Sequence, residues 1–311
     1  MVRRTPPNST PINQLTTRPR HTLTDAEKAA YISAELCLQA ASPQLGIPGA
    51  QSRWDELQYV HVTQTPVIHM VGAFLPWHRL YVRAHEHLLQ SECGYAGGQP
   101  YWNETRDVAA LADSSLFDPD TGFGGDGIGS DGCVADGPFA NLTLRFAKNG
   151  EFGDYCLERS LSSRGFEGAA QSNVEGCLES EGFESAWSCY EGPLHNAGHG
   201  GVGGTMVDLS SSPGDPLFFL HHSWLDKLWW DWQLGNLSAR LTDIGGTNMP
   251  TDRYIEMNGF TEPGSAIYDY DGDPGNVTTL NHNLWMVGVI PNVTIAEVMD
   301  LGGDIVCAEY V

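Results

Sequence analysis

The chain has 311 residues, which is enough for one large domain or two small ones with a buried core. Acidic residues outnumber basic ones by 39 to 16, and the net charge of −23 makes nucleic acids and anionic membranes poor partners. No apolar run approaches the roughly 18 residues of a transmembrane helix, so the composition favours a globular protein that does not span a membrane.

The N-terminal region predicts an extended arm followed by a helix. Residues 1–20 are rich in Pro, Thr and Asn, a composition typical of an arm without regular structure. Thr24 and Glu27 form a capping-box pattern, in which each side chain satisfies a free N–H group at the start of a helix. Apolar residues recur at helical spacing after it, so we expect a helix that ends near Leu38.

The next segments alternate between helical pattern and irregular sequence. Residues 50–92 predict two helices that separate around Pro66, the second of them over about 77–90. The many Gly and Asp residues of 94–137 predict a long surface excursion. The stretch 138–190 is polar, contains cysteines and stays ambiguous.

Helical pattern returns in the second half of the chain. It covers residues 185–199, stops at the glycines that follow His199, and resumes over 215–234. The remainder is rich in turns, with a short helix expected near 294–300. No linker divides the chain, so we predict one mainly α domain over 21–311, with long loops and little β structure.

Cysteines and glycosylation sequons indicate an extracellular protein. Seven cysteines at irregular spacings, without a Cys-x-x-Cys pair, argue against a zinc knuckle and for disulfides. Their pairing and the identity of the odd cysteine stay open. The first residues lack the apolar core of a signal peptide, so we expect a secreted chain that starts after a removed one. Six Asn-x-Ser/Thr sequons are candidate glycosylation sites: Asn8, Asn103, Asn141, Asn236, Asn276 and Asn292.

Histidines are concentrated in two bands, which contain nine of the eleven in the chain, at 61–87 and 195–222. His195 and His199 are four residues apart, so on a helix both imidazoles point the same way. A third histidine from a following helix would complete a three-nitrogen set with an open position. Imidazole suits Zn, Cu, Fe and Ni alike, so a mononuclear or zinc hydrolase stays open, although Asn196 replaces the Glu of a zinc-protease motif.

The two bands together resemble the two copper-binding motifs of the type-3 copper family, which comprises tyrosinases, catechol oxidases and mollusc-type haemocyanins. Residues 69–79 match the pattern His-x₄-Phe-Leu-x-Trp-His-Arg, and residues 215–226 match Asp-Pro-x-Phe-(apolar)-x₂-His-x₃-Asp. Both ends of the chain resemble, more loosely, the short secreted polyphenol oxidases of ascomycete fungi. The resemblance implies an antiparallel four-helix bundle that holds two copper ions, with O₂ as co-substrate.

The resemblance also assigns the metal ligands. For the first copper they are His61, His69 and His78, and for the second they are His195, His199 and His222. His61 is in addition the only histidine between His21 and His69.

The remaining histidines do not fit the motifs. His221 adjoins His222 but faces about 100° around the helix from it, and the motif selects His222 as the ligand. His85 and His87 are expected to have structural or surface roles, and His21 and His282 are isolated.

Further site residues follow from the resemblance. Asp226 is a candidate carboxylate partner for a ligand imidazole, with a salt bridge on the helix surface as the alternative. Phe218 is expected to pack over the ligand rings and Leu209 to stand over one copper at the pocket mouth, while Gly200 leaves the pocket open. Asn196 and Glu191 would hold a water as the base for phenol hydroxylation, although Glu191 could simply be a charge at a helix start.

The resemblance implies oxidation of catechols to o-quinones with O₂ on small phenolic substrates. Hydroxylation of monophenols and oxidation of o-aminophenols stay open, as does the oligomeric state. Reversible O₂ carriage, as in haemocyanin, is the alternative from another class of protein. Two departures from the family matter: no cysteine lies between Cys37 and Cys93 to form a thioether with His69, and no C-terminal shielding domain follows, so we expect an open site.

Overall fold

Helices dominate the computed structural model, which describes residues 15–146, 152–260 and 273–311. The predicted mainly α fold is confirmed. Most of the predicted arm and the sequon at Asn8 lie outside the described residues. The helices are α1 (Asp25–Ala40), α2 (Arg53–Ile68), α3 (Phe74–Cys93), α4 (Ser163–Phe166), α5 (Gln171–Leu178), α6 (Phe183–Cys189), α7 (His195–Val202), α8 (Leu217–Leu234), α9 (Leu237–Arg240), α10 (Asp252–Asn258) and α11 (Ile295–Val298).

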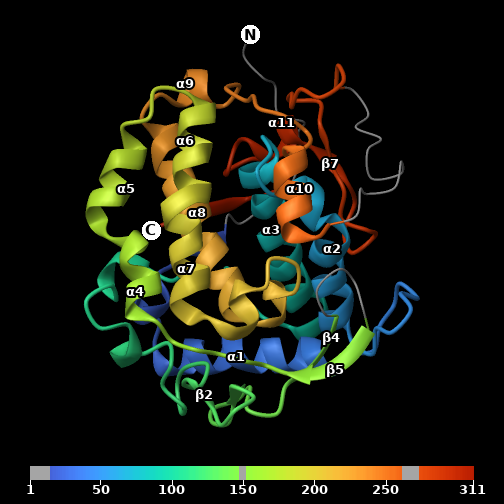
Figure 1. Cartoon of the computed structure of the whole chain (residues 1–311), viewed down its shortest axis with the longest axis vertical. Helices are drawn as coiled ribbons and strands as arrows, with labels where there is room; N and C mark the ends of the chain where they lie inside the picture. Colours follow the sequence, from blue (N-terminus) through green and yellow to red (C-terminus); the bar gives the residue numbers. More distant parts are fainter. Residues whose placement is uncertain (1–14, 147–151, 261–272) are drawn as a thin grey trace, which may run out of the picture.

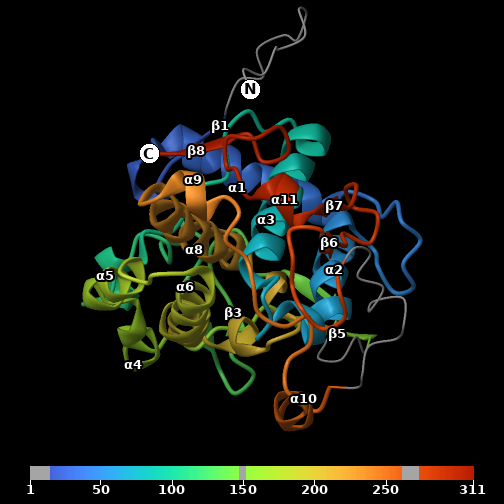
Figure 2. The same ribbon diagram turned by 90° about the horizontal axis from the view of Figure 1, so that it is seen from above.

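Four of these helices form the centre of the molecule. Helix α3 packs against α2 and α8, and α8 packs in turn against α7. Helix α1 runs across α2 and α3 (Figures 1 and 2). Helix α8 is buried over most of its length, because aromatic and aliphatic side chains occur on nearly all of its faces. The histidine bands therefore lie on helices that are enclosed by others.

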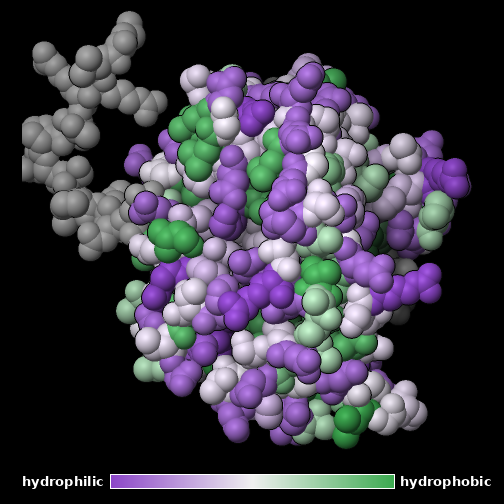
Figure 3. Space-filling model, turned by 90° about the vertical axis from the view of Figure 1, so that its left-hand side faces the viewer, coloured by the Kyte–Doolittle hydropathy of each residue, from purple (hydrophilic) through white to green (hydrophobic). Residues whose placement is uncertain are grey.

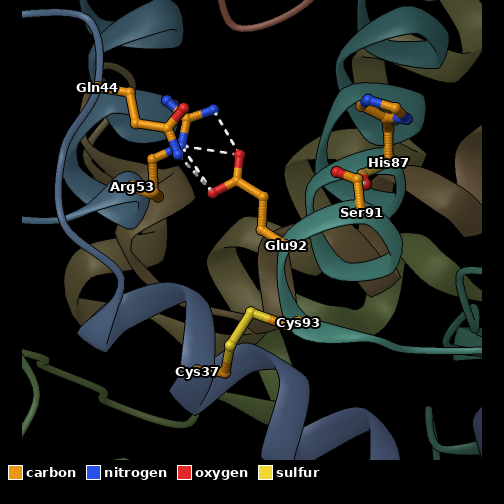
Figure 4. The surroundings of a disulfide bond; sticks show 7 residues. All are labelled: Cys37, Gln44, Arg53, His87, Ser91, Glu92 and Cys93. Carbon is orange, nitrogen blue, oxygen red and sulfur yellow. Dashed lines mark hydrogen bonds and ion pairs between the residues drawn. A yellow bond between two sulfur atoms is a disulfide. The ribbon is translucent and has the colours of Figure 1, made fainter.

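Helix α1 begins as its sequence predicts. The Thr24 side chain accepts a hydrogen bond from the Glu27 N–H, and the Glu27 carboxylate accepts one from the Thr24 N–H. The far end of α1 is tied to the end of α3 by a disulfide between Cys37 and Cys93 (Figure 4). This bond closes a segment with a sequence separation of 56, which contains the whole first histidine band up to position 87.

Arg53, at the start of α2, forms ion pairs with Glu92 near the same disulfide and with Glu56 (Figure 4). A predicted break at Pro66 is wrong. Helix α2 continues to Ile68, and the chain turns only at His69. Pro66 lies in the last turn, where its missing N–H and the contact of its ring with the preceding turn affect only the end of the helix.

Helices α6 and α7 are joined through a π-helical turn, Tyr190–Leu194, which contains Pro193. The predicted helical stretch 185–199 is therefore confirmed, with one wider turn in it. Helix α7 ends at Gly203, whose φ of +69° suits glycine because it has no Cβ.

Within the described residues the strands are short and occur as four two-stranded pairs. Strand β1 lies parallel to β8, so the described beginning of the chain is fixed against its end (Figure 2). The ambiguous stretch 138–190 contains a hairpin and short helices. The strands are β1 (Leu15–Thr17), β2 (Gly127–Ile128), β3 (Cys133–Val134), β4 (Thr143–Phe146), β5 (Phe152–Cys156), β6 (Asn283–Leu284), β7 (Val293–Thr294) and β8 (Ala308–Tyr310).

Two further disulfides connect Cys133 with Cys156 and Cys177 with Cys189, which leaves Cys307 as the odd cysteine. Hydrophilic residues cover most of the face in Figure 3, with apolar residues in small separate groups. Within the described residues, no helix combines the length and apolarity needed to cross a membrane. Among the described sequons, Asn103 is half-buried and the others are exposed: Asn141, Asn236, Asn276 and Asn292.

Candidate metal centre

Two groups of histidines meet between α2, α3, α7 and α8. In each group every member offers one ring nitrogen, and these nitrogens lie within 4.8 Å of one another. The first group is His61, His69 and His78, and the second is His195, His199, His221 and His222. The structure therefore brings together all six predicted ligands and adds His221.

Backbone carbonyls orient the imidazoles of the first group. The Nδ1 atoms of His61, His69 and His78 face the carbonyl oxygens of Ser210, Thr65 and Phe74 at 2.9, 3.1 and 2.8 Å. A carbonyl can only accept a hydrogen bond, so each Nδ1 carries the proton and each Nε2 keeps a free lone pair. Metal-binding histidines are held by this kind of contact.

The second group is oriented in a similar way. The Nδ1 of His199 faces the Met206 carbonyl at 2.5 Å. Met206 and Ser210 belong to one loop after α7, so this loop holds one imidazole from each group.

The unpaired ring nitrogens show that both groups fit a metal. The Nε2 atoms of His61, His78, His195, His199, His221 and His222 are buried without a hydrogen-bond partner among the described residues. Burial lowers the pKa of all seven imidazoles, to about 3 for His69 and His199, so they are neutral near pH 7. Neutral imidazoles with free lone pairs suit copper and other borderline metals, and a bound ion would offset the cost of the unpaired atoms.

The two groups face each other between two aromatic walls. The rings of His78 and His222 are stacked, with centroids 4.3 Å apart. Phe218 lies 4.1 Å from His222 and 5.3 Å from His61, centroid to centroid, in the contact expected of it. On another side, Phe74 lies 4.6 Å from His78 and 4.9 Å from His195, a contact that the sequence did not predict.

Asp226 does not contact a ligand imidazole, and it is not on the helix surface either. Its carboxylate accepts hydrogen bonds from Arg79 Nε at 2.5 Å and from the Tyr310 hydroxyl at 2.7 Å. The predicted contact with a ligand imidazole is therefore wrong, and the salt bridge, although present, is buried between two helices and not on the helix surface. The reason is that α3 packs against α8 and brings the buried Arg79 to this carboxylate. Arg79 follows His78 directly, so the pair joins the two helices that carry His78 and His222.

The Arg79 guanidinium is almost fully paired. It donates to the carbonyls of Val298 and Met299 and to the Gln233 side chain, and it lies 3.8 Å from the Trp229 ring centroid. Sequence analysis missed this role, although the Arg of the first motif was its signal. An arginine next to a ligand thus joins α3, α8 and α11.

Glu191 is buried in the π-helical turn that precedes His195. Its carboxylate accepts hydrogen bonds from the Met70 N–H at 2.6 Å and from the Trp187 indole N–H. Burial raises the pKa of Glu191 to about 8, and these two donors oppose the shift. Met70 follows His69 and has a φ of +56°, so Glu191 holds a strained turn beside a ligand.

The other predicted pocket residues lie around the same region. Asn196 is exposed on α7, and its role with Glu191 stays a prediction. Leu209 is half-buried in the loop that holds His61 and His199. Gly200 faces α4, because a Cβ on it would lie 3.5 Å from the Gly165 carbonyl oxygen.

His221 also borders the second group, although the motif selects His222 as the ligand. It is fully buried, and its Nδ1 forms a hydrogen bond with the Glu104 carboxylate. It borders the group because α7 approaches α8 so closely that a residue turned by about 100° from His222 is still next to the other histidines. Gly198 permits this approach, since a Cβ there would lie 2.1 Å from His221 Nδ1.

The two histidines after His78 lie outside both groups. His85 is buried and its ring nitrogens face Glu35 and Gln99, while His87 is exposed on α3 (Figure 4).

Comparison with known proteins identifies the region that contains all the histidines of both groups. The sequence model of the common central domain of tyrosinase matches residues 51–234. A tyrosinase-like protein of Diaporthe leptostromiformis is 30% identical over 311 aligned residues, which cover 93% of this chain and 75% of that protein. The N-acetyl-6-hydroxytryptophan oxidase of Emericella nidulans is 30% identical and covers 93% of this chain and 90% of its own length.

A solved structure extends this similarity to the fold. The polyphenol oxidase of Thermothelomyces thermophila, in a G292N variant, superposes with a TM-score of 0.81 at 28% identity. The alignment covers 97% of this chain and 90% of that one.

Proposed function

This chain belongs to the tyrosinase family, and on that premise we propose that it is a type-3 copper oxidase that converts o-diphenols to o-quinones with O₂. Proteins of this family bind a dinuclear copper site. The observation that carries the proposal is the pair of facing histidine groups, whose buried Nε2 atoms have no described partner. His61, His69 and His78 would hold one copper and His195, His199 and His222 the other.

The reaction is a two-electron oxidation for each diphenol. When bound, the copper pair supplies the redox couple through which two diphenols give four electrons and four protons to one O₂, which becomes two waters. Backbone carbonyls hold four of these imidazoles, those of His61, His69, His78 and His199, in fixed tautomers. Phe74 and Phe218 pack against the rings and exclude water from them.

Hydroxylation of monophenols is a second proposed activity, because it needs a base that this site can offer. Because burial raises the pKa of Glu191 to about 8, this carboxyl is ionised mainly at alkaline pH. In the ionised form each oxygen can accept more than one hydrogen bond, so Glu191 would hold a water beyond its bonds to Met70 and Trp187. The exposed amide of Asn196 is one turn further along and would hold the same water. That water would take the phenol proton.

The substrates proposed are small phenols, with Leu209 over one copper at the pocket mouth. Similarity to a relative named as an N-acetyl-6-hydroxytryptophan oxidase supports substrates that carry a hydroxylated aromatic ring. Oxidation of o-aminophenols would use the same residues. Three disulfides and four exposed sequons support a secreted glycoprotein.

The proposal is tested by incubating copper-loaded protein in parallel with a catechol, a monophenol and an o-aminophenol while O₂ and quinone are followed. We expect immediate quinone from the catechol and, after a lag, from the monophenol. Binding of O₂ without quinone would favour a haemocyanin-like carrier instead. Zinc, or one metal per chain, in the purified protein would favour the hydrolase.

A further inference from the structure

The second histidine group contains a fourth imidazole that the proposed function does not use. His221 is fully buried on α8, and its ring centroid is 4.9 Å from that of His199 and 5.0 Å from that of His222. One of its ring nitrogens lies within 4.8 Å of the nitrogens that the other three offer. In the first group, only three imidazoles meet among the described residues.

The hydrogen bonds of His221 are those of a metal ligand. Its Nδ1 is paired with the Glu104 carboxylate, and its Nε2 is buried without a described partner. Metal-binding histidines commonly give their second nitrogen to a carboxylate, which fixes the ring and makes the free nitrogen more basic. Within the two groups, His221 is the member for which such a carboxylate contact is found.

Glu104 adds a second sign that a cation belongs here. It is completely buried, and one of its oxygens has no hydrogen-bond partner among the described residues. Burial raises the pKa of Glu104 well above its ordinary value, because the ionised form with an unpaired oxygen is costly there unless positive charge lies nearby. A metal held by His221 would supply that charge through the imidazole.

The backbone of α7 is shaped to admit His221. Gly198 lies between His195 and His199, and a Cβ on it would be 2.1 Å from His221 Nδ1. Glycine inside a helix costs about 0.5–1 kcal/mol relative to alanine. At position 198 the missing Cβ leaves the space in which the His221 ring approaches the group.

We propose that His221 is an auxiliary ligand of the second metal position. It binds the ion together with His195 and His199 when His222 is not bound to it. This rests on the proposed function in that it takes both groups to be copper positions. An ion entering the second position then meets two alternative sets of three imidazoles, whereas an ion entering the first position meets one set.

The test compares copper content in variants of the full chain after loading with Cu(II) and dialysis. The variants are His222→Ala, the double variant His222→Ala with His221→Phe, and His78→Ala as the matched control in the first group. His222→Ala should retain close to two coppers per chain, while the double variant and His78→Ala should each retain one. X-ray absorption at the copper edge should show that the retained ion keeps imidazole ligands, a readout that does not depend on whether two neighbouring Cu(II) ions couple magnetically.

Glu104→Gln provides a second measurement in which no histidine is removed. Combined with His222→Ala, it should lower the copper affinity of the second position by about tenfold or more, the range known for such outer carboxylates. In the otherwise unchanged chain it should slow copper uptake at this position and not at the first. This readout also applies if His222→Ala fails to fold.

The outcomes are distinguishable. One copper in His222→Ala would overturn the auxiliary role, as would two coppers in the double variant or unchanged affinity and uptake in Glu104→Gln. A parent chain that does not hold two coppers would instead overturn the proposed function.

Discussion

His78 of α3 and His222 of α8 lie face to face, with ring centroids 4.3 Å apart and ring planes 11° apart. One belongs to each histidine group, so their spacing sets how closely the two metal positions approach. Arg79 follows His78 directly, and Asp226 lies one turn after His222. Their buried ion pair joins the same two helices and therefore fixes this spacing.

Replacing Asp226 with Asn should destabilise the fold by about 3–5 kcal/mol, because the buried Arg79 guanidinium loses its counter-charge. Copper retention should fall as well. Chemical denaturation of the metal-free protein measures the loss. Lys227→Ala is the control, since it breaks an i,i+4 pair with Asp231 that is more exposed and worth at most about 1 kcal/mol. Similar losses in the two variants would contradict the role given to Asp226.

Gly198→Ala and Gly200→Ala should change stability in opposite directions, although both lie on α7. A Cβ at Gly198 would be 2.1 Å from His221 Nδ1, so the ring or the helix must move. A Cβ at Gly200 would make an ordinary contact, 3.5 Å from the Gly165 carbonyl oxygen. Gly200→Ala should therefore gain up to about 1 kcal/mol from helix propensity, while Gly198→Ala loses stability. Thermal unfolding of the two metal-free variants decides this, and equal shifts would refute the packing described.

Glu191 should make the metal-free protein less stable as pH rises. Burial raises the pKa of Glu191 from 4.5 to about 8, so in between the folded chain keeps a proton that the unfolded chain has released. Its contribution is therefore present below about pH 4.5 and is lost as pH rises through about 8. Glu191→Gln stays neutral, so from about pH 5 to 8 the parent should lose more stability than the variant. Urea denaturation across this range gives both profiles, and parallel profiles would rule the shift out.

The disulfide between Cys37 and Cys93 should stabilise the chain more than that between Cys177 and Cys189. Their sequence separations are 56 and 12, which correspond to about 4 and about 3 kcal/mol of chain entropy in the unfolded state. Paired Cys→Ser variants, compared by thermal unfolding, should follow that order. Cys307→Ser is the control, because Cys307 forms no disulfide and its removal should change little. The reverse order would show that native packing outweighs chain entropy here.

The parts of the site that lie within one motif could be predicted from the sequence. Five of the six histidines occupy positions that the two motifs and the i,i+4 pair define, and the structure brings them together with His61. Helical spacing alone explains why His195 and His199 point to one side. The start of α1 was predictable for the same reason, since a capping box involves only residues three apart.

Partners from distant parts of the chain could not be predicted. Asp226 and Arg79 are 147 residues apart, and His221 and Glu104 are 117 apart. The helical face of His221 relative to His222 was correctly inferred, but its surroundings depend on how closely α7 packs. The sequence shows a glycine at 198, yet only the fold shows that a side chain from α8 occupies the space beside it.

The most direct test of the central claim is the ratio of O₂ consumed to o-quinone formed by the copper-loaded protein supplied with excess catechol. If the two coppers pass electrons from two diphenols to one O₂, the protein should consume one O₂ for every two quinones formed. This ratio should hold over many turnovers. Removing the copper with a chelator should abolish the reaction, and copper addition should restore it. Reversible O₂ uptake without quinone, or full activity in the metal-free protein, would contradict the account.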